Sequence, residues 1–491
     1  MTQPKNGTFL QALIPLGVLV ILLILNVTYF HDDASYGPNQ IALLIAAAVA
    51  GLISFRNGHS WDGIMDGLLK SINQAMPSIL ILMLIGALAG TWLISGIVPA
   101  MIYYGLEILS PKVFLFAACV VCMIVSLATG SSWSTAATVG VALIGIGKTL
   151  GFGEGIVAGA IISGAYFGDK MSPLSDTTNL APAVAGTDLF THIRFMSYST
   201  IPSITIALII FLILGFTNSG EVKSEEIAAV QASIKGAFNL NPLLFLAPAI
   251  VIGLIVKKVP ALPALLIGAL LGGVFAVIFQ PDLMPQISPL IDNGVAPEGM
   301  DPNGWQVSFT AVMQAMYGDT QILTGNASVE RLLSQGGMMG MMFVILLVIT
   351  AMVFGGAMEL GGFLRAMIQP ILDLAKSTTS MVASTVGTCV LFNVVASEQY
   401  VSIVVPGKMF AESYDDNDLP PELLSRTLED SGTVTSVLVP WNSCGAYHKG
   451  VLGVDPVAYL PYAFFNLISP VMSIIITATG YKLYKKVKTA Q

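Results

Sequence analysis

Charge is the property that this sequence has least of. Only 10% of its 491 residues are Asp, Glu, Lys or Arg, and 55% are hydrophobic, with a mean hydropathy of +0.79. Average soluble domains carry roughly 25% charged residues, so this chain has too little polar surface to cover a globule. That excludes a soluble enzyme, a nucleic-acid-binding protein and a disordered chain. Many apolar runs approach the ~20 residues that a membrane-spanning helix needs, which predicts an all-α polytopic membrane protein.

Residues for catalysis and metal chemistry are also scarce, with four cysteines and four histidines in the whole chain. Cys119 and Cys122 form a CxxC pair, but they lie on a predicted membrane helix with no second pair nearby, which favours a packing role. We find no nucleophile–base pair and no cluster of metal ligands. The sequence therefore predicts no enzyme, no catalytic residues and no cofactor other than a transported or coupling ion.

Long apolar runs predict the membrane spans. The predicted spans are 9–30, 41–55, 77–97, 112–129, 152–168, 197–216, 242–256, 261–280, 337–354, 380–396, 423–440 and 456–481. Shorter apolar segments indicate extra crossings or re-entrant segments, at 98–110, 133–150, 363–375 and 400–410. The first run is too long for the core of a signal peptide, so we expect it to remain in the mature protein.

The basic residues predict the topology, because Lys and Arg are enriched in cytoplasmic loops. Lys5 precedes the first span and Arg56 follows the second, while the loop 31–40 between them has neither residue type. The N-terminus is therefore expected in the cytoplasm. A lysine cluster near the C-terminus predicts that this end is cytoplasmic too, and consists of Lys482, Lys485, Lys486 and Lys488.

The second half of the chain has the opposite orientation by the same rule. Lys257 and Lys258 lie between the spans 242–256 and 261–280, and the segment 281–330 contains no Lys or Arg. The hairpin at 242–280 is therefore predicted to enter the membrane from the side opposite to the first hairpin. The polar segments 217–241 and 281–336 are expected outside, as a linker and an insertion.

Short sequence matches relate the two halves in the same order. The matched groups are Ala42 to Ile45 and Gly51 with Ala264 to Ile267 and Gly273, Gly90 and Gly96 with Gly356 and Gly362, and Pro173, Gly186 and Asp188 with Pro440, Gly453 and Asp455. Within each group the spacing is constant. Together with the reversed charge bias, this predicts inverted-topology repeats at 9–216 and 242–481. Secondary transporters are typically built this way, with substrate and ions bound at interrupted helices.

In the first half, two polar interruptions break the apolar runs, at Thr129 to Thr135 and at Gly168 to Asn179. Pro173 should end a helix within the second interruption. Carboxylates at membrane depth are costly unless they pair or bind a cation, so Asp176 is the leading candidate for a Na⁺ ligand that also exchanges a proton. The other candidate ion ligands are Ser131, Ser132, Thr177, Thr178 and Asn179. Asp169 is a second candidate proton carrier, or it pairs with Lys170 or caps the helix. The alternative for Asp176 is a helix cap or an exposed loop residue.

In the second half, polar residues occupy the corresponding positions. Glu398 and Gln399 stand where the first interruption lies, and Asn442 and Ser443 correspond to Ser175 and Asp176. Glu398 is a candidate proton carrier, and the alternative is an interfacial residue. These residues predict a second half of the substrate site, formed by Glu398, Gln399, Asn442 and Ser443.

Three motifs give the chain its resemblance to a known family. The segments TGSSWSTAATVG (129–140), GAYFGDKMSPLSDTTNLAPAVAGTDLFTHI (164–193) and PWNSCGAY (440–447) resemble the NhaC-type sodium/proton antiporter family, and the likeness runs over nearly the whole chain. The resemblance implies a fold of the broader ion-transporter superfamily. Each inverted repeat would contain a re-entrant hairpin and a broken helix, and a transport domain would move against a scaffold in an elevator-type motion, usually in a homodimer.

We therefore expect a secondary transporter that exports cytoplasmic Na⁺ in exchange for H⁺ in a bacterial inner membrane. The alternative is a Na⁺-coupled carrier of a small carboxylate or an amino acid, because family relatives include a malate/lactate exchanger and apparent amino-acid carriers. No intramembrane arginine is obviously placed to hold a carboxylate, which favours the simple antiporter. A passive channel is a third possibility, and the paired interruptions argue against it.

Overall fold

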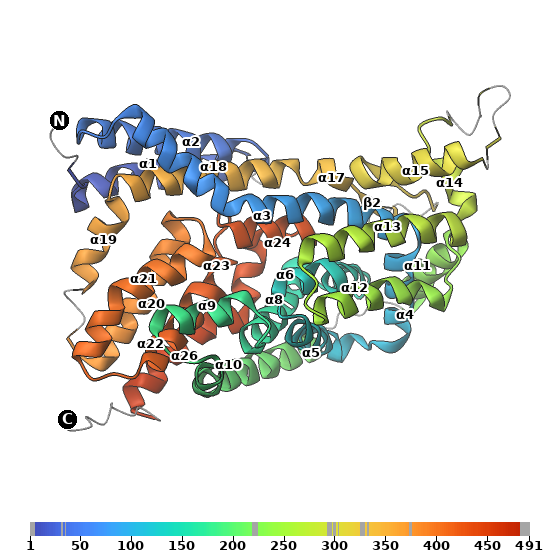
Figure 1. Ribbon diagram of the computed structural model, residues 1–491. Coiled ribbons are helices and arrows are strands. Elements are labelled where there is room, and N and C mark those ends of the chain that lie inside the picture. Colours follow the sequence, from blue (N-terminus) through green and yellow to red (C-terminus); the bar gives the residue numbers. More distant parts are fainter. Residues whose placement is uncertain are drawn as a thin grey trace.

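The chain folds almost entirely into helices, as the sequence predicts (Figure 1). The computed structural model describes residues 5–30, 33–34, 36–218, 224–291, 297, 301–302, 304–324, 329–330, 333–372 and 376–481. Within these residues, eight helices are long and apolar enough to cross a membrane, or up to ten if each of two bent helix pairs counts as one span. The four C-terminal lysines expected in the cytoplasm lie outside the described residues.

The first half of the chain contains helices that alternate between long spans and short pieces. They are α1 (Phe9–Phe30), α2 (Pro38–Arg56), α3 (Trp61–Ile94), α4 (Ile97–Ile108), α5 (Pro111–Thr129), α6 (Ser132–Thr135), the π-helix η2 (Ala136–Gly140), α7 (Val141–Thr149), α8 (Glu154–Met171), α9 (Asp176–Ala185) and α10 (Leu189–Asn218).

The connecting region and the second half follow a similar alternation. They comprise α11 (Ser224–Ala237), η3 (Pro242–Phe245), α12 (Leu246–Val256), α13 (Ala261–Phe279), η4 (Pro281–Leu283), α14 (Met284–Ile287), α15 (Trp305–Tyr317), α17 (Gly337–Gly340), α18 (Met342–Leu360), α19 (Phe363–Leu372), α20 (Thr378–Val395), α21 (Gln399–Asp416), α22 (Pro421–Leu428), the π-helix η5 (Glu429–Thr433), α23 (Val434–Ser436), α24 (Ser443–Leu452), α25 (Pro456–Tyr459), η6 (Leu460–Tyr462) and α26 (Phe464–Thr479). Two short strands, β1 (Thr320–Gln321) and β2 (Ser334–Gln335), pair antiparallel, with Thr320 opposite Gln335.

Several expected spans have different boundaries in the structure. The run expected at 77–97 belongs to the 34-residue helix α3, which begins at Trp61 after its Ser60 cap accepts the Gly63 amide. The run expected at 242–256 is present as the η3–α12 segment, Pro242–Val256, and α11 meets this segment at 93°. The expected span 456–481 is broken, with a bend of 56°. Hydropathy does not detect the second bend, because both arms of the broken span are apolar.

The two polar segments expected as an external linker and an external insertion both contain helices. Segment 217–241 contains α11, which packs against α4. The insertion 281–336 contains α15, which packs against α3 and α13 and buries Val307, Ala311 and Ala315. The sequence signal was weak because α15 buries only one narrow stripe of small side chains.

The apolar helices of each half pack against helices of the other half. Helix α13 lies against α3, and α18 lies against both α2 and α3. The close approach of α13 to α3 uses Gly268, whose carbonyl accepts a hydrogen bond from the Trp92 indole at 3.1 Å. In Figure 1 the α1–α2 and α12–α13 hairpins point their connecting loops toward the middle of the molecule from opposite ends.

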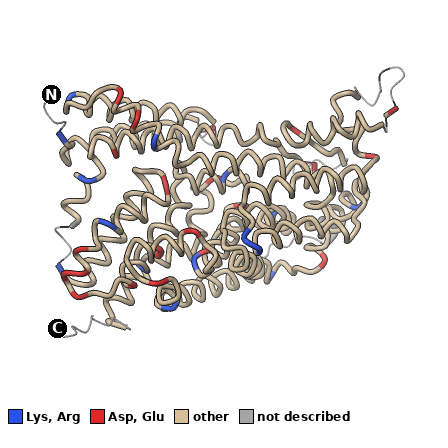
Figure 2. The backbone as a smooth tube through the Cα atoms, in the orientation of Figure 1, with Lys and Arg blue, Asp and Glu red and all other residues tan. Residues whose placement is uncertain are grey.

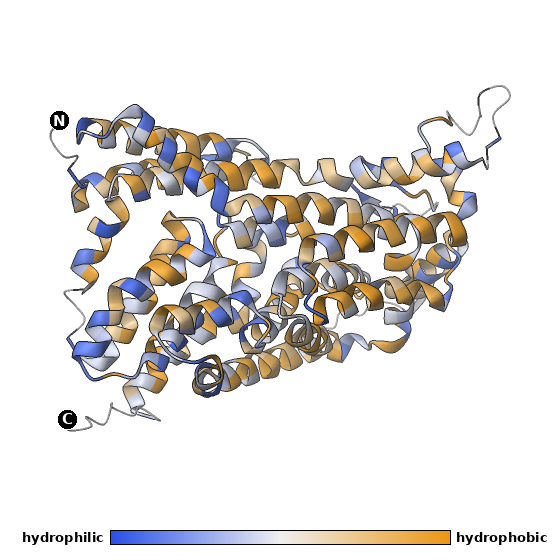
Figure 3. Cartoon of the chain, viewed as in Figure 1, coloured by the Kyte–Doolittle hydropathy of each residue, from blue (hydrophilic) through white to orange (hydrophobic). Residues whose placement is uncertain are grey.

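Hydrophobic colour runs along α12 and α13 in Figure 3, and charged residues are sparse in Figure 2. Exposed apolar residues such as Leu270 and Val274 (53% and 51% exposed) lie on α13, as a lipid-facing surface requires. The multiple apolar helices show that this is an integral membrane protein.

Left-handed backbone conformations occur at matched positions in the two halves. Gly96 (φ 82°) and Gly362 (φ 69°) precede α4 and α19, and Gly186 (φ 82°) and Gly453 (φ 69°) end α9 and α24. These are the glycines that the sequence comparison pairs. A positive φ favours glycine because it has no Cβ, so the same local turns recur at the same places in each half.

Candidate functional site

The first interruption of each half is a sharp break between two helices. Helix α5 ends at Gly130 (φ 69°), and Ser131 then caps α6 by accepting the Ser134 amide at 3.1 Å. In the second half, Ser397 (φ 60°) follows α20, and Glu398 caps α21. Both breaks therefore place an oxygen-bearing side chain at the start of a new helix, where the helix dipole favours negative charge.

The second interruptions also end in capped helices. Helix α8 ends at Met171, and Ser175 caps α9 by accepting the Thr178 amide. In the other half, Asn442 caps α24 by accepting the Cys444 amide at 3.0 Å. Pro173 and Pro440 stand within these breaks, as the sequence predicted, because proline cannot donate to the preceding turn.

The two interruptions of the first half pack directly on each other. A Cβ added at Gly130 would lie 2.7 Å from the Leu174 carbonyl carbon and 2.9 Å from the Ser175 nitrogen. No side chain fits there. Glycine at this position therefore holds the two breaks in contact, in addition to allowing the left-handed turn.

A cavity of about 810 Å³ brings together residues from both halves of the chain. Its walls include most of the candidates named from the sequence, namely Ser131, Asp169, Asp176, Thr177, Asn179, Glu398 and Gln399. The cavity also borders the loop at Lys258 to Leu262, between α12 and α13. The remaining candidates do not line it, and these are Ser132, Thr178, Asn442 and Ser443.

Asp176 and Asp169 have different environments within the cavity. Asp176 is the first residue of α9, and its side chain is exposed at the cavity. Asp169 is only 8% exposed, and its carboxylate accepts hydrogen bonds from the Ser132 amide (3.0 Å) and hydroxyl (2.6 Å). Asp176 is thus free to bind a solute, whereas Asp169 is held by the first break.

The buried candidates of the first half hold the wall of the cavity in place. Ser132 donates to Asp169, and the Thr178 hydroxyl donates to the Lys170 carbonyl at 3.0 Å. Asn179 lines the cavity, while its amide donates to the Pro173 and Ser175 carbonyls. These bonds connect the end of α8 to the start of α9 across the break.

Glu398 is the carboxylate that the second half contributes. It is 3% exposed, and its carboxylate accepts the Ser443 hydroxyl at 2.5 Å and the Tyr400 amide at 3.4 Å. Asn442 donates to the Asn393 carbonyl at 3.1 Å. Ser443 therefore holds Glu398, Asn442 connects the start of α24 to α20, and neither residue lines the cavity.

Sequence reasoning missed the aromatic part of the cavity. The rings of Trp133 and Tyr447 stack with centroids 3.8 Å apart and planes at 22°, and the Tyr447 hydroxyl donates to the Trp133 carbonyl at 2.9 Å. Tyr400 lines the cavity as well. The available signal was that each of these aromatic residues stands within a few residues of a polar break.

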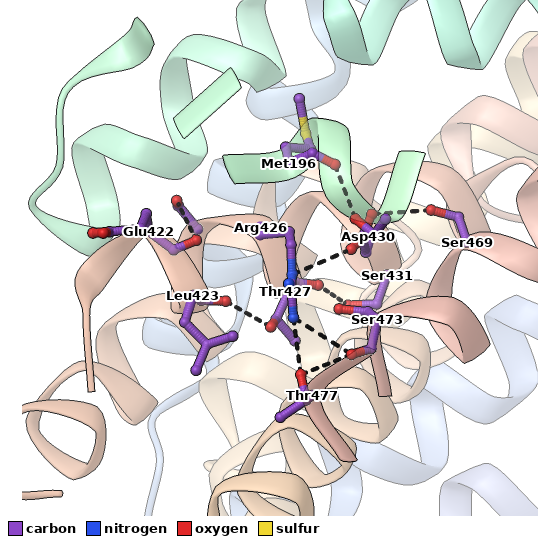
Figure 4. Close-up of polar contacts among 12 residues, drawn as sticks. Met196, Glu422, Leu423, Arg426, Thr427, Asp430, Ser431, Ser469, Ser473 and Thr477 are labelled. Atoms are coloured by element: carbon purple, nitrogen blue, oxygen red, sulfur yellow. Dashed lines mark hydrogen bonds and ion pairs between the residues drawn. The ribbon is translucent and has the colours of Figure 1, made fainter. Parts of the chain in front are cut away.

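The buried lysine beside the second break has a different partner from the one expected. Lys170 is fully buried and forms an ion pair with Asp430 on η5, not with its neighbour Asp169. Asp430 also faces Arg426 on α22, with an Nε–Oδ2 distance of 3.8 Å (Figure 4). The chain thus contains a buried arginine, but that arginine faces Asp430 and does not line the cavity.

Comparison with known proteins finds relatives that match nearly the whole chain. A model of the Na⁺/H⁺ antiporter family matches residues 164–294 and 303–481. A Na⁺/H⁺ antiporter NhaC of Alkalihalophilus pseudofirmus is 35% identical, covering 98% of this chain and 98% of its own. A malate-2H⁺/Na⁺-lactate antiporter of Bacillus subtilis is 35% identical, covering 98% and 96%. An arginine/ornithine antiporter, ArcD, of Halobacterium salinarum is 37% identical, covering 98% and 94%. The family match and these full-length relatives together show that the chain belongs to the Na⁺/H⁺ antiporter family, among its NhaC-type members.

Proposed function

We propose that the protein is a secondary transporter that exports cytoplasmic Na⁺ in exchange for external H⁺. The observation that carries this proposal is one cavity, lined by Asp169 and Asp176 from the first half and by Glu398 from the second. Carboxylates at membrane depth are stable when they hold a cation or a proton. A site that alternates between the two occupants performs antiport.

Within this proposal, Asp176 is the main Na⁺ ligand and proton carrier. Ser131, Thr177 and Asn179 supply further oxygens at the same wall of the cavity, and Ser132 and Thr178 fix that wall. Asp169 and Glu398 are the other proton carriers. Gln399 adds a neutral amide from the second half, Ser443 orients Glu398, and Asn442 caps the helix that carries Ser443.

The transport motion is proposed to be of the elevator type, in two inverted repeats assembled as a homodimer. The matched left-handed turns and the packing of each half on the other support the repeats. The basic residues Lys5, Arg56, Lys257 and Lys258 support cytoplasmic termini in a bacterial inner membrane. Because the cavity borders Lys258, this topology makes the present conformation open to the cytoplasm.

A second candidate function is Na⁺-coupled exchange of a small carboxylate or an amino acid. The cavity volume of about 810 Å³ lies within the roughly 300–1,000 Å³ typical of small-molecule sites, which is more than a bare ion requires. Trp133, Tyr447 and Lys258 on its walls offer apolar and cationic contacts to an organic anion. The printed names of two relatives, a malate/lactate and an arginine/ornithine antiporter, motivate the same candidate.

The first test is Na⁺-dependent proton movement in everted membrane vesicles. We expect Asp176→Asn to abolish it, because the amide neither carries the charge nor exchanges the proton. Glu412→Gln is the matched control, since it removes an exposed carboxylate from α21 outside the cavity. Full activity in Asp176→Asn would refute the assigned role of this residue.

The second test separates the two candidate functions. Proteoliposomes are loaded with Na⁺ and supplied with labelled malate, lactate or arginine, with and without a Na⁺ gradient. Gradient-driven accumulation of one solute would establish the organic carrier. Na⁺ counterflow with no uptake of any solute would establish the simple antiporter.

A further inference from the structure

Glu429 is a buried carboxylate that the proposed site does not use. It begins the π-helix η5, its side chain is 0% exposed, and neither of its oxygens has a hydrogen-bond partner among the described residues. Transfer of an ionised carboxylate from water without compensation is strongly unfavourable. Glu429 is therefore stable at this position only when it holds a proton or when a cation compensates its charge.

Two threonine hydroxyls lie beside the same carboxylate. Thr433, one turn later on η5, is 0% exposed, and its hydroxyl has no hydrogen-bond partner among the described residues. The hydroxyls of Thr433 and Thr177 lie close to Glu429, and the Thr177 hydroxyl also contacts the Ser175 hydroxyl at 3.2 Å. Buried threonine hydroxyls beside a carboxylate are suitable oxygen ligands for a hard cation.

The two buried cations nearby are committed to a different acid. Lys170 pairs with Asp430 and donates to the Ser469 hydroxyl at 3.0 Å. Arg426 faces Asp430 and donates to the Thr477 hydroxyl at 2.9 Å, as Figure 4 shows. Among the described residues, both cations therefore form their ion pairs with Asp430, and Glu429 has no ion pair of its own.

The buried ionisable groups of this region carry more negative than positive charge. Three acids, Asp169, Glu429 and Asp430, and two bases, Lys170 and Arg426, all at most 8% exposed, lie close together. When all five are ionised, the net charge is one negative. One monovalent cation neutralises it, whereas a divalent cation would leave an excess positive charge in a low-dielectric environment.

The same carboxylate lies close to the cavity. Thr177 lines the cavity, and its hydroxyl also lies close to Glu429. The widened turn of a π-helix often marks a functional position, and η5 packs against α9, the helix that carries Thr177. Thr177 therefore links Glu429 to the wall of the cavity.

From these observations we propose that Glu429, Thr433 and Thr177 form a second Na⁺ site behind the wall of the cavity. This inference rests on the proposed Na⁺ transport and adds a second ion to it. Carboxylate and hydroxyl oxygens are hard ligands suited to a hard cation. Na⁺ at Glu429 would neutralise the net negative charge of the five buried ionisable groups, while Asp176 remains available for the first ion.

The experiment is equilibrium binding of radiolabelled Na⁺ to the purified full-length protein in detergent. Glu429→Gln and Thr433→Val should each halve the Na⁺ bound per chain, and Asp176→Asn should remove the other half. Thr427→Val is the matched control, because that buried hydroxyl lies six residues before Thr433 and donates to the Leu423 carbonyl at 2.7 Å. Thr433→Val keeps the measurement informative if Glu429→Gln fails to fold.

The outcomes separate this inference from the proposed function. Wild-type stoichiometry in both Glu429→Gln and Thr433→Val overturns the second site, while loss of binding in Asp176→Asn leaves the first site intact. Halved binding in Glu429→Gln with no change in Asp176→Asn supports the second site and refutes the role of Asp176. An absence of Na⁺ binding in the wild-type protein overturns both. Infrared spectra at saturating Na⁺ give a further check. A carboxylic-acid band that is present in the wild-type protein and missing in Glu429→Gln would show that Glu429 holds a proton in place of Na⁺, and would overturn the inference.

Discussion

The Trp133 indole stacks on the Tyr447 ring at 3.8 Å, and the Tyr447 hydroxyl donates to the Trp133 carbonyl. These residues come from opposite halves of the chain, next to the first break of one half and the second break of the other. The stack therefore joins the two halves at the cavity wall. Any motion that opens this wall must separate the rings.

Removing the Tyr447 hydroxyl should weaken this junction. We expect Tyr447→Phe to lower stability by about 1 kcal/mol, because it removes one hydrogen bond and retains the ring. Tyr447→Ala should cost more, since the stacking contact and the buried ring area are also lost. Thermal unfolding in detergent measures both, and equal melting temperatures for the two variants would contradict the importance of the stack.

Ser443 should control Glu398 without touching the solute. Its hydroxyl donates to the Glu398 carboxylate at 2.5 Å, and Ser443→Ala leaves that carboxylate with the Tyr400 amide as its remaining described donor. A hydrogen bond to a charged group contributes roughly 1.5–3 kcal/mol. We expect a shift in the pH profile of transport, measured in everted vesicles, while Ser443→Thr preserves the wild-type profile.

The buried ion pair makes a sharp stability prediction. Lys170→Met should destabilise the protein by about 3–5 kcal/mol, because it leaves buried carboxylates uncompensated. Asp430→Asn should be at least as harmful, since it removes the partner of both Lys170 and Arg426. The double variant Lys170→Met/Asp430→Asn should lose less unfolding free energy than the sum of the losses in the two single variants. Strict additivity would indicate that the two residues do not interact.

Gly130 should tolerate no side chain. Gly130→Ala imposes a left-handed conformation that costs roughly 1–2 kcal/mol for an L-residue, and its Cβ would contact the Leu174 backbone at 2.7 Å. Gly153→Ala is the matched control, because φ there is −60° and no atom lies within 4 Å of the added Cβ. Comparable melting temperatures and Na⁺ transport in both variants would contradict the packed break.

The proposed topology predicts the side from which the cavity is labelled. Lys258→Cys should react with a membrane-impermeant thiol reagent in everted vesicles, where the cytoplasmic face is outside. Gln321→Cys, on the insertion expected at the external face, should react in intact cells. The four native cysteines are buried, so background labelling should be low. The reverse pattern of labelling would invert the topology.

Much of the local structure was predictable from the sequence. Pro173 and Pro440 end helices, and Gly96, Gly186, Gly362 and Gly453 adopt left-handed turns, because proline and glycine act on the backbone next to them. These effects do not depend on distant partners. The bend near 463 was not predictable, because its apolar arms read as one continuous span.

The partners of the buried charges were not predictable, since they depend on how distant helices pack. Lys170 follows Asp169 in the chain but pairs with Asp430, 260 residues away. Ser443 was expected at the solute site and instead holds Glu398 from behind. Helical geometry points neighbouring side chains in different directions, so adjacency in sequence says little about contact between them.

By itself, the sequence determined that this chain lies in a membrane, where its helices break, and which few acids lie at those breaks. Hydropathy and backbone preference are local properties, and they act before any long-range contact forms. Only the tertiary structure decided which carboxylates share a cavity. Packing places Asp176 and Glu398 on its walls and leaves Glu429 behind it, because burial depends on the fit of whole helices and not on the residues beside each acid.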